Sequence, residues 1–335
     1  MCYTASVATT PADTWRPLAE ALLGTAELTA PEVAREAGLD PAQARRLWRA
    51  LGFPPVENDE RIFTRRDVEI VRAVRVLIES QASDPGDVVQ LTRVIGRSLA
   101  NVADAQVTVA AERLQLGRGA AVSDGTAVAE LAERLVSLVP SLEQFLGYVW
   151  RRQLLAALRR RSAVPSTADR RLTVGFADLV GFTVLSQALA PRELAAIVDR
   201  FEALAYEHIL ERGGRVVKMI GDEVMFAVDD GAFAADIALA LVEAYTRDTD
   251  VPDVRVGLAS GSALAWEGDL YGTTVNLASR LVNLARPRSV LLSDALGEQL
   301  RDDPRFALRH LRPVNLQGIG RVRAWVLRRA SVSRT

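Results

Sequence analysis

The spacing of apolar residues changes once along this chain, near residue 170. Before that point, apolar residues recur at helical intervals of three and four, as in VEIVRAVRVLIES (68–80). After it, short β-rich runs such as LTVGFAD (172–178) and VRVGLASG (254–261) alternate with helical stretches. These two periods predict an all-α domain followed by an α+β domain.

The second half has the order β-α-β-β-α-β, which is typical of a ferredoxin-like fold with an antiparallel sheet and helices on one face. Proline and glycine mark breaks between the helices of the first half, including one at Pro140. We therefore expect a flexible N-terminus (1–17), an all-helical domain (18–141), a linker helix (142–168) and an α+β domain (169–330).

Composition narrows the class of protein. The formal net charge of −1 over 335 residues gives no overall field that would favour nucleic acid or membrane. Cys2 is the only cysteine, so an internal disulfide is excluded and a reducing compartment fits. We find no signal-peptide pattern and no run of the ~18 apolar residues that a membrane span needs. We expect a cytoplasmic protein.

Lys218 is the only lysine in a chain with 41 basic residues. A genome that favours arginine codons explains the other basic positions but makes this exception informative. A compact ammonium and a forked guanidinium are not interchangeable at a tight site. The exception points to a functional role for Lys218.

Two short motifs place carboxylates where a strand ends. In FADLVGFT (176–183), Asp178 ends a strand, and the backbone N–H groups around Gly181, Phe182 and Thr183 can face phosphate oxygens. In KMIGDEVMF (218–226), Asp222 lies in a tight turn between two strands. Asp178 and Asp222 could hold a metal ion together with substrate phosphates. The alternatives are that Asp178 caps a helix and that Asp222 is only a turn residue.

A third motif, DLYGTTVNLASRL (269–281), leads from a strand end into a helix. Asn276 and Arg280 are four residues apart and share one helix face. Arginine suits a phosphate whose charge grows in a transition state. A solvated polar face is the alternative for this pair.

Together, the three motifs resemble the catalytic domain of class III adenylyl cyclases over residues 172–328, about half of the chain. Their order and spacing carry the resemblance, since each motif alone is common. The matching positions are Phe176, Asp178, Lys218, Gly221, Asp222, Asp269, Gly272, Val275, Asn276 and Arg280.

The resemblance implies that Asp178 and Asp222 bind two Mg²⁺ or Mn²⁺ ions per active site, with the backbone carbonyl of Leu179 as a further ligand. It implies that Lys218 and Asp269 read adenine. A lysine can only donate, to N1, and an ionised aspartate can only accept, from the N6 amino group. Guanine has the opposite pattern at both positions, so this pair favours ATP over GTP.

The resemblance also implies that Asn276 orients the ribose and that Arg280 stabilises the pentavalent phosphorus while the 3′-OH displaces pyrophosphate. In this family one subunit supplies the metal carboxylates and the other supplies the remaining residues. A chain with both sets and one catalytic domain is therefore expected to act as a head-to-tail homodimer.

One segment departs from the family pattern. Many relatives have a late lysine that contacts the terminal phosphates of the substrate, but here the segment NLQGIGRVR (315–323) has Gln317 and Ile319. Arg321 or Arg323 could replace that lysine.

The first half contains a helix-turn-helix-like segment (28–53), with helices expected at 30–37 and 41–50 and Arg45, Arg46 and Arg49 near one face. The balanced charge argues against strong phosphate binding, so we do not expect a nucleic-acid partner. Leu47, Trp48 and Leu51 are expected in the core.

The first half also resembles the helical regulatory domain of some mycobacterial cyclases, which are autoinhibited and in part activated by mild acid. The helix at 142–161 would then transmit the signal, or its basic end could lie on anionic lipid. Two other functions stay open: a catalytically silent nucleotide-binding dimer, and a DNA-binding regulator that uses segment 28–53.

Overall fold

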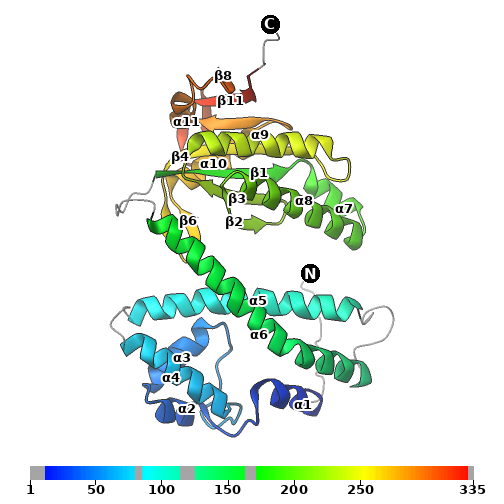
Figure 1. Ribbon diagram of the computed structural model, residues 1–335, viewed down its shortest axis with the longest axis vertical. Helices are drawn as coiled ribbons and strands as arrows, with labels where there is room; N and C mark the ends of the chain where they lie inside the picture. Colours follow the sequence, from blue (N-terminus) through cyan, green and yellow to red (C-terminus); the bar gives the residue numbers. More distant parts are fainter. Residues whose placement is uncertain (1–11, 80–84, 114–124, 163–170, 331–335) are drawn as a thin grey trace. The chain divides into compact units, whose positions relative to one another are not determined.

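The computed structural model describes residues 12–79, 85–113, 125–162 and 171–330 (Figure 1). The chain divides into two compact units, Met1–Pro165 and Ser166–Thr335. The first unit is helical and the second combines helices with strands, so the chain is α+β overall. The change in the spacing of apolar residues near residue 170 predicts this.

The first unit contains α1 (Ala12–Leu23), α2 (Ala30–Ala37), α3 (Pro41–Ala50), α4 (Arg65–Glu79), α5 (Pro85–Arg113) and α6 (Gly125–Ser162). The Thr29 side chain caps α2 in a capping box with Glu32, and α2 ends at Gly38, whose φ of 71° is left-handed. The Asp40 carboxylate caps α3. The helices expected at 30–37 and 41–50 are confirmed.

A small core holds the helix-turn-helix-like segment together. Val33, Phe63 and Val68 are buried in it, and the half-buried Trp48 stacks edge-on against Phe63 at a ring-centroid distance of 5.0 Å. Leu47 is also buried, as expected. The α3 residues Arg45, Arg46 and Arg49 are exposed.

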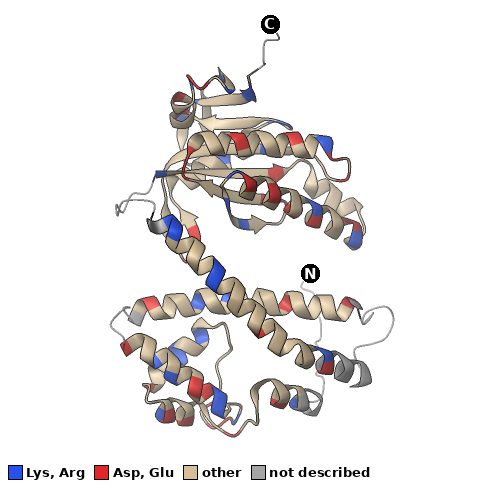
Figure 2. Ribbon diagram, viewed as in Figure 1, with Lys and Arg blue, Asp and Glu red and all other residues tan. Residues whose placement is uncertain are grey.

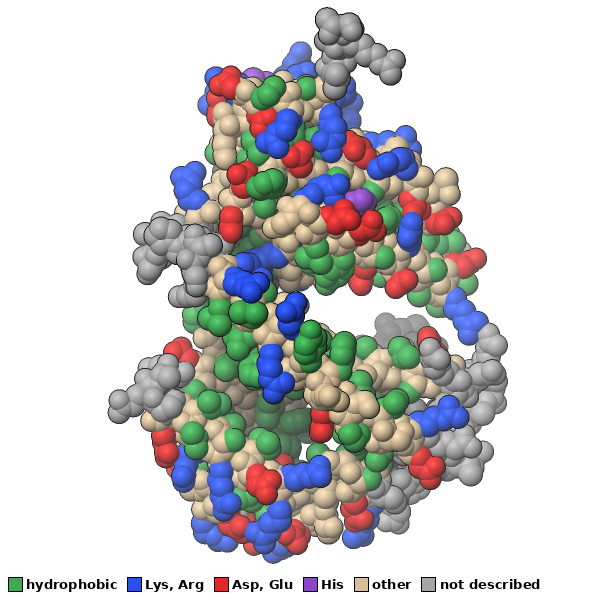
Figure 3. All heavy atoms as spheres, viewed as in Figure 1, with side chains coloured by type: hydrophobic (Ala, Val, Ile, Leu, Met, Phe, Trp, Pro, Cys, Tyr) green, Lys and Arg blue, Asp and Glu red, His purple; other side chains and the backbone are tan. Residues whose placement is uncertain are grey.

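The break expected at Pro140 is wrong, because α6 is one continuous helix of 38 residues that contains Pro140. A proline inside a helix removes one backbone hydrogen bond, but the Ala-, Glu-, Leu- and Arg-rich segments on both sides favour the helix. The second half of α6 exposes large apolar side chains, and its last turns are basic (Figures 2 and 3). None of the described helices is both long and apolar enough to cross a membrane.

The second unit is built on a seven-stranded sheet of order β2-β3-β1-β4-β7-β11-β8. Its strands are β1 (Arg171–Leu179), β2 (Arg215–Ile220), β3 (Glu223–Val228), β4 (Val254–Ser262), β7 (Val290–Ser293), β8 (Phe306–His310) and β11 (Ala324–Arg329). Two hairpins lie outside it, β5 (Leu264–Trp266) with β6 (Asp269–Tyr271), and β9 (Val314–Leu316) with β10 (Gly320–Val322). The helices are α7 (Phe182–Ala188), α8 (Pro191–Glu211), α9 (Gly231–Arg247), α10 (Thr273–Leu284) and α11 (Asp294–Gln299).

Two details of the predicted sheet are wrong. The sheet is mixed rather than antiparallel, because β4 and β7 pair in parallel. The helices cover both faces: residues of α8, α9 and α11 form one core with the sheet, and residues of α10 form another (Figure 1). The connection from β4 to β7 passes through α10, and a crossover of this kind joins parallel strands.

Helix α10 lies directly against β4 because Gly257 has no side chain. A Cβ at Gly257 would be 2.6 Å from the Ala278 carbonyl oxygen and 2.8 Å from the Leu281 carbonyl carbon. The Thr274 hydroxyl also donates to the Ser262 carbonyl oxygen at 2.7 Å. These contacts fix the helix that carries Asn276 and Arg280.

Candidate active site

Asp178 lies at the end of β1 on the α10 side of the sheet. Even-numbered β1 residues such as Val174 and Phe176 pack in the α10 core, and odd-numbered ones such as Ala177 pack in the α8–α9 core, so the strand alternation sets the direction of Asp178. Asp178 is 8% exposed. Burial raises the pKa of its carboxyl, while a hydrogen bond and the charge of Arg255 lower it.

Asp222 is brought beside Asp178 by the turn between β2 and β3. Gly221 takes a left-handed φ of 63° in that turn, and the Leu179 N–H donates to the Asp222 carbonyl oxygen at 3.0 Å. The charge of Asp222 contributes to the raised pKa of Asp178. The two carboxylates predicted from separate motifs therefore lie at one edge of the sheet.

Two charged residues at this edge were not singled out by sequence reasoning. Glu223 is the cross-strand partner of Asp178 on β3, and Arg255 is its partner on β4. Burial and the charges of Asp178 and Asp222 raise the pKa of Glu223 to about 7. Arg255 donates to one oxygen of Asp178, Oδ2, at 2.6 Å from both Nε and Nη2. No sequence signal marks these two residues, since their roles arise from strand pairing.

Gly181, Phe182 and Thr183 form the start of α7, directly after β1. Gly181 has a left-handed φ of 78° and is the N-cap. Phe182 packs partly into the α8–α9 core, and Thr183 is exposed. The short loop thus follows Asp178 and faces solvent at the same end of the strand.

Lys218 and Asp269 meet although they are 51 positions apart. Lys218 lies on β2 and Asp269 begins β6, and the Lys218 Nζ donates to the Asp269 Oδ2 at 2.5 Å. The second oxygen of Asp269 accepts from the Leu270 N–H at 2.8 Å. Both side chains are partly exposed, at 39% and 18%. The pair presents a cationic donor and an anionic acceptor side by side.

Asn276 and Arg280 lie on α10 and are exposed. Among the described residues, neither makes a hydrogen bond or ion pair with Asp178, Asp222, Lys218 or Asp269. The site residues of one chain thus form separate groups.

The segment with Gln317 and Ile319 is the turn between β9 and β10, and both residues are exposed. Arg323 is paired with Asp294 at 3.2 Å. Arg321 is exposed on β10, and no described acidic side chain pairs with it.

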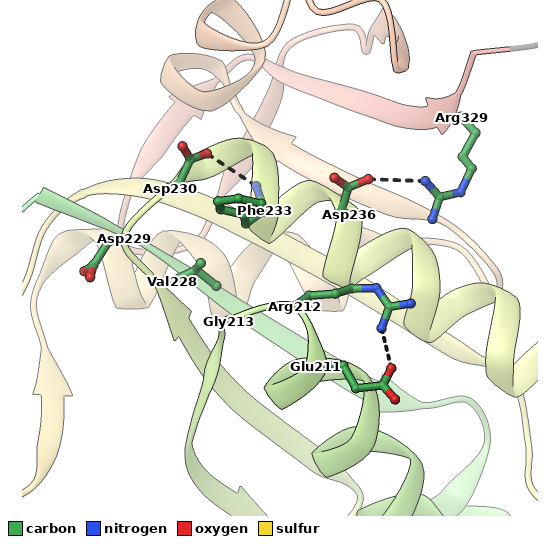
Figure 4. Close-up of a pocket in the computed structure, with 9 residues that line it drawn as sticks. All are labelled: Glu211, Arg212, Gly213, Val228, Asp229, Asp230, Phe233, Asp236 and Arg329. Carbon is green, nitrogen blue, oxygen red and sulfur yellow. Dashed lines mark hydrogen bonds and ion pairs between the residues drawn. The ribbon is translucent and has the colours of Figure 1, made fainter. Parts of the chain in front are cut away.

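A pocket of about 730 Å³ lies elsewhere on the second unit, lined by residues from α8, β3, α9 and β11 (Figure 4). Its acidic side chains are largely engaged: Asp230 caps α9, and Asp236 pairs with Arg329 at 3.2 Å. It contains none of the predicted site residues.

Both halves of the chain match known families. Residues 164–329 match the family described as the adenylate and guanylate cyclase catalytic domain, and residues 6–162 match the adenylate cyclase regulatory domain.

Two curated relatives span most of the chain. An adenylate cyclase of Streptomyces coelicolor is 37% identical over 328 residues, which are 89% of this chain and 85% of the relative. The pH-sensitive adenylate cyclase MT1302 of Mycobacterium tuberculosis is 31% identical over 314 residues, 91% of this chain and 79% of the relative. The crystal structure of the adenylyl cyclase CyaB from P. aeruginosa aligns with a TM-score of 0.43 and 22% identity, over 48% of this chain and 95% of that one. The chain belongs to the adenylate and guanylate cyclase family, and within it to the members that carry an adenylate cyclase regulatory domain before the catalytic domain.

Proposed function

We propose that this protein is an adenylate cyclase that converts ATP to 3′,5′-cyclic AMP and pyrophosphate. The observation that carries the proposal is the pair of Lys218 and Asp269, 2.5 Å apart. Adenine offers an acceptor, N1, beside a donor, the N6 amino group, and this pair matches both. Two relatives that match about nine tenths of the chain are named adenylate cyclases, which supports the same substrate.

The edge with Asp178 and Asp222 fits a divalent cation. Burial is the main reason that the pKa of Asp178 is raised, and the charge of Asp222 adds to it; a cation would stabilise both carboxylates. Among the described residues no group of three or more acidic, histidine or cysteine side chains could hold a metal by itself, which favours two carboxylates, the Leu179 carbonyl and substrate phosphates as ligands. Bound Mg²⁺ or Mn²⁺ would activate the ribose hydroxyl and neutralise charge on the leaving pyrophosphate.

The remaining residues bind and orient the substrate. The N–H groups of Gly181, Phe182 and Thr183, at the first turn of α7, would donate to phosphate oxygens. Asn276 orients the ribose so that its 3′-OH is in line with the α-phosphorus. Arg280 donates to the phosphoryl oxygens, whose charge grows as the new P–O bond forms and the bond to pyrophosphate breaks.

We further propose that the active enzyme is a head-to-tail homodimer with two equivalent sites. Within the part of the chain that the structure describes, Asn276 and Arg280 make no hydrogen bond or ion pair with Asp178 or Asp222, which is expected if they serve the site of the partner. The β5–β6 hairpin supports this arrangement, because Leu264 and Trp266 are 59% and 51% exposed and large apolar side chains of this kind are typical of an interface.

The first unit is proposed to inhibit the second, with α6 as the connecting element. The similarity to a relative named as pH-sensitive makes pH a candidate signal. The test compares cyclic AMP production by the full chain and by residues 163–335 across a pH series. Autoinhibition predicts a higher rate from the shorter chain, and equal rates at every pH would contradict it.

The proposed chemistry is tested by mixing two inactive variants. Asp178→Ala lacks a metal ligand, and Arg280→Ala lacks the transition-state donor, so each is expected to be inactive with ATP and Mn²⁺. A mixed dimer has one site with both defects and one intact site, so activity should return on mixing. Failure of both the full wild-type chain and residues 163–335 to form cyclic AMP would refute the reaction, and failure of complementation would refute the shared site.

A further inference from the structure

Arg255 is the third member of a charged row that crosses three adjacent strands. The register pairs Glu223 on β3 with Asp178 on β1, and Asp178 with Arg255 on β4. The neighbours of Arg255 on β4, Val254 and Val256, face the α8–α9 core, so Arg255 faces the α10 side, like Asp178. Its position beside the proposed metal carboxylate is fixed by the sheet.

The contact between Arg255 and Asp178 is close and partly shielded from water. Both Nε and Nη2 of Arg255 lie 2.6 Å from Asp178 Oδ2, and the side chains are 29% and 12% exposed. The third nitrogen, Nη1, donates to the backbone carbonyl of Asn283 at 3.3 Å, near the end of α10. Charge-assisted bonds in such a setting are stronger than those of an exposed ion pair.

The guanidinium donates to Oδ2 of Asp178, so a divalent cation that binds both carboxylate oxygens must compete with it for Oδ2. The two cations also repel one another across the same carboxylate, and little water is present to screen them. The Asn283 carbonyl gives the guanidinium an anchor that does not involve Asp178. Arg255 can therefore release Asp178 without losing every hydrogen-bond partner.

We infer that Arg255 is a built-in counter-ion for Asp178 that competes with the metal and weakens metal binding to the nucleotide-free enzyme. The inference rests on the proposed metal site. Arg255 acts through Asp178 and is thus a positioning residue: it orients the carboxylate while no metal is bound. The guanidinium repels a metal ion at this edge and competes with it for Oδ2 of Asp178.

The test measures Mn²⁺ binding to the full chain in the absence of nucleotide, by the loss of the free-Mn²⁺ electron paramagnetic resonance signal. Arg255→Gln removes the competitor and should tighten Mn²⁺ binding by roughly ten- to a hundredfold, the worth of a hydrogen bond to a charged group. Arg288→Gln is the matched control. It also removes one positive charge from an Asp–Arg pair, with Asp253 at 2.7 Å, and should leave Mn²⁺ affinity unchanged.

Thermal unfolding of each Arg255 variant shows whether it is folded, and Arg255→Lys is a second, more conservative variant in case Arg255→Gln is not. Lysine keeps the charge but donates from one nitrogen, so it should give a smaller increase in Mn²⁺ affinity than glutamine. Wild-type or weaker affinity in a folded Arg255 variant overturns the inference. Asp178→Asn separates this failure from a wrong metal site: if it leaves Mn²⁺ binding intact, the proposed site itself is refuted.

Discussion

The close approach of α10 to β4 at Gly257 gives a prediction that links packing to catalysis. In Gly257→Ala the new methyl group would lie 2.6 Å from the Ala278 carbonyl oxygen, whereas ordinary contact begins near 3.4 Å. The Val282 backbone nitrogen would lie closer still, and because both obstacles are helix backbone, α10 must move by about 1 Å. Overpacking of this kind costs about 1–3 kcal/mol, and each kcal/mol lowers the melting temperature of a unit this size by roughly 2–4 °C.

The same displacement carries Asn276 and Arg280 away from the substrate. A misplacement of this size can lower a rate by about 10²-fold, because the reacting groups no longer align. We expect kcat to fall by about that factor in Gly257→Ala.

Gly175→Ala is the control for a purely structural effect. Its methyl group would meet side-chain atoms, Phe226 Cε1 at 2.5 Å and Leu258 Cδ2 at 2.7 Å, on the face opposite α10. It should therefore lose stability without displacing α10. Thermal unfolding and kcat are measured for both variants. Equal activity losses in the two variants would refute the argument that the position of α10 limits the rate.

Three further predictions concern adenine recognition, the stability of the fold at acid pH and the formation of the homodimer. Lys218→Glu with Asp269→Cys should lower ATP turnover on the order of 10⁴-fold, because the adenine edge is left unpaired; unchanged turnover would refute the base-reading pair. Burial, and then the charge of Arg212, lower the pKa of His208 in the folded state. Below pH 6.5 the unfolded chain therefore binds a proton that the folded chain does not, and the free energy of unfolding falls as the pH drops through this value. His208→Asn should then narrow the gap in melting temperature between about pH 7.5 and about pH 5.5, and an unchanged gap would contradict this origin. Leu264→Ser with Trp266→Ser should shift sedimentation towards monomer and make specific activity fall on dilution; a stable, active dimer would exclude the hairpin from the interface.

Local patterns were enough to predict α2, α3 and the strands that carry the motifs, but not α1, which begins at Ala12 within the N-terminus expected to be flexible. Thr29, Glu32 and Gly38 act within one turn of α2, so their effect is visible in sequence. The spacing of Asn276 and Arg280 likewise fixes their shared face. Pro140 shows the limit of such rules, because its local preference to end a helix was overridden by the segments on both sides.

Pairing between distant strands could not be predicted in the same way. The parallel pair of β4 and β7 involves only the register Val256 to Val290, Gly257 to Leu291 and Leu258 to Leu292, and such short apolar runs fit either direction. The sheet face that each helix covers could not be predicted for the same reason. Helix α10 lies on the face opposite α8 and α9 because the β4–β7 connection passes over that face. An apolar strand buried on both sides gives no sign of which helix covers it.

The residues that sequence reasoning missed are those whose roles depend on register alone. Arg255 contacts Asp178 because β1 and β4 pair at those two positions, 77 residues apart in the chain. A slip of one residue in β1 would turn Asp178 towards the α8–α9 core, where its charge would have no partner and Leu179 would take its place. Apolar side chains on both faces of β1 oppose that slip, and the chemistry at the strand end is thereby set by the packing of the whole strand.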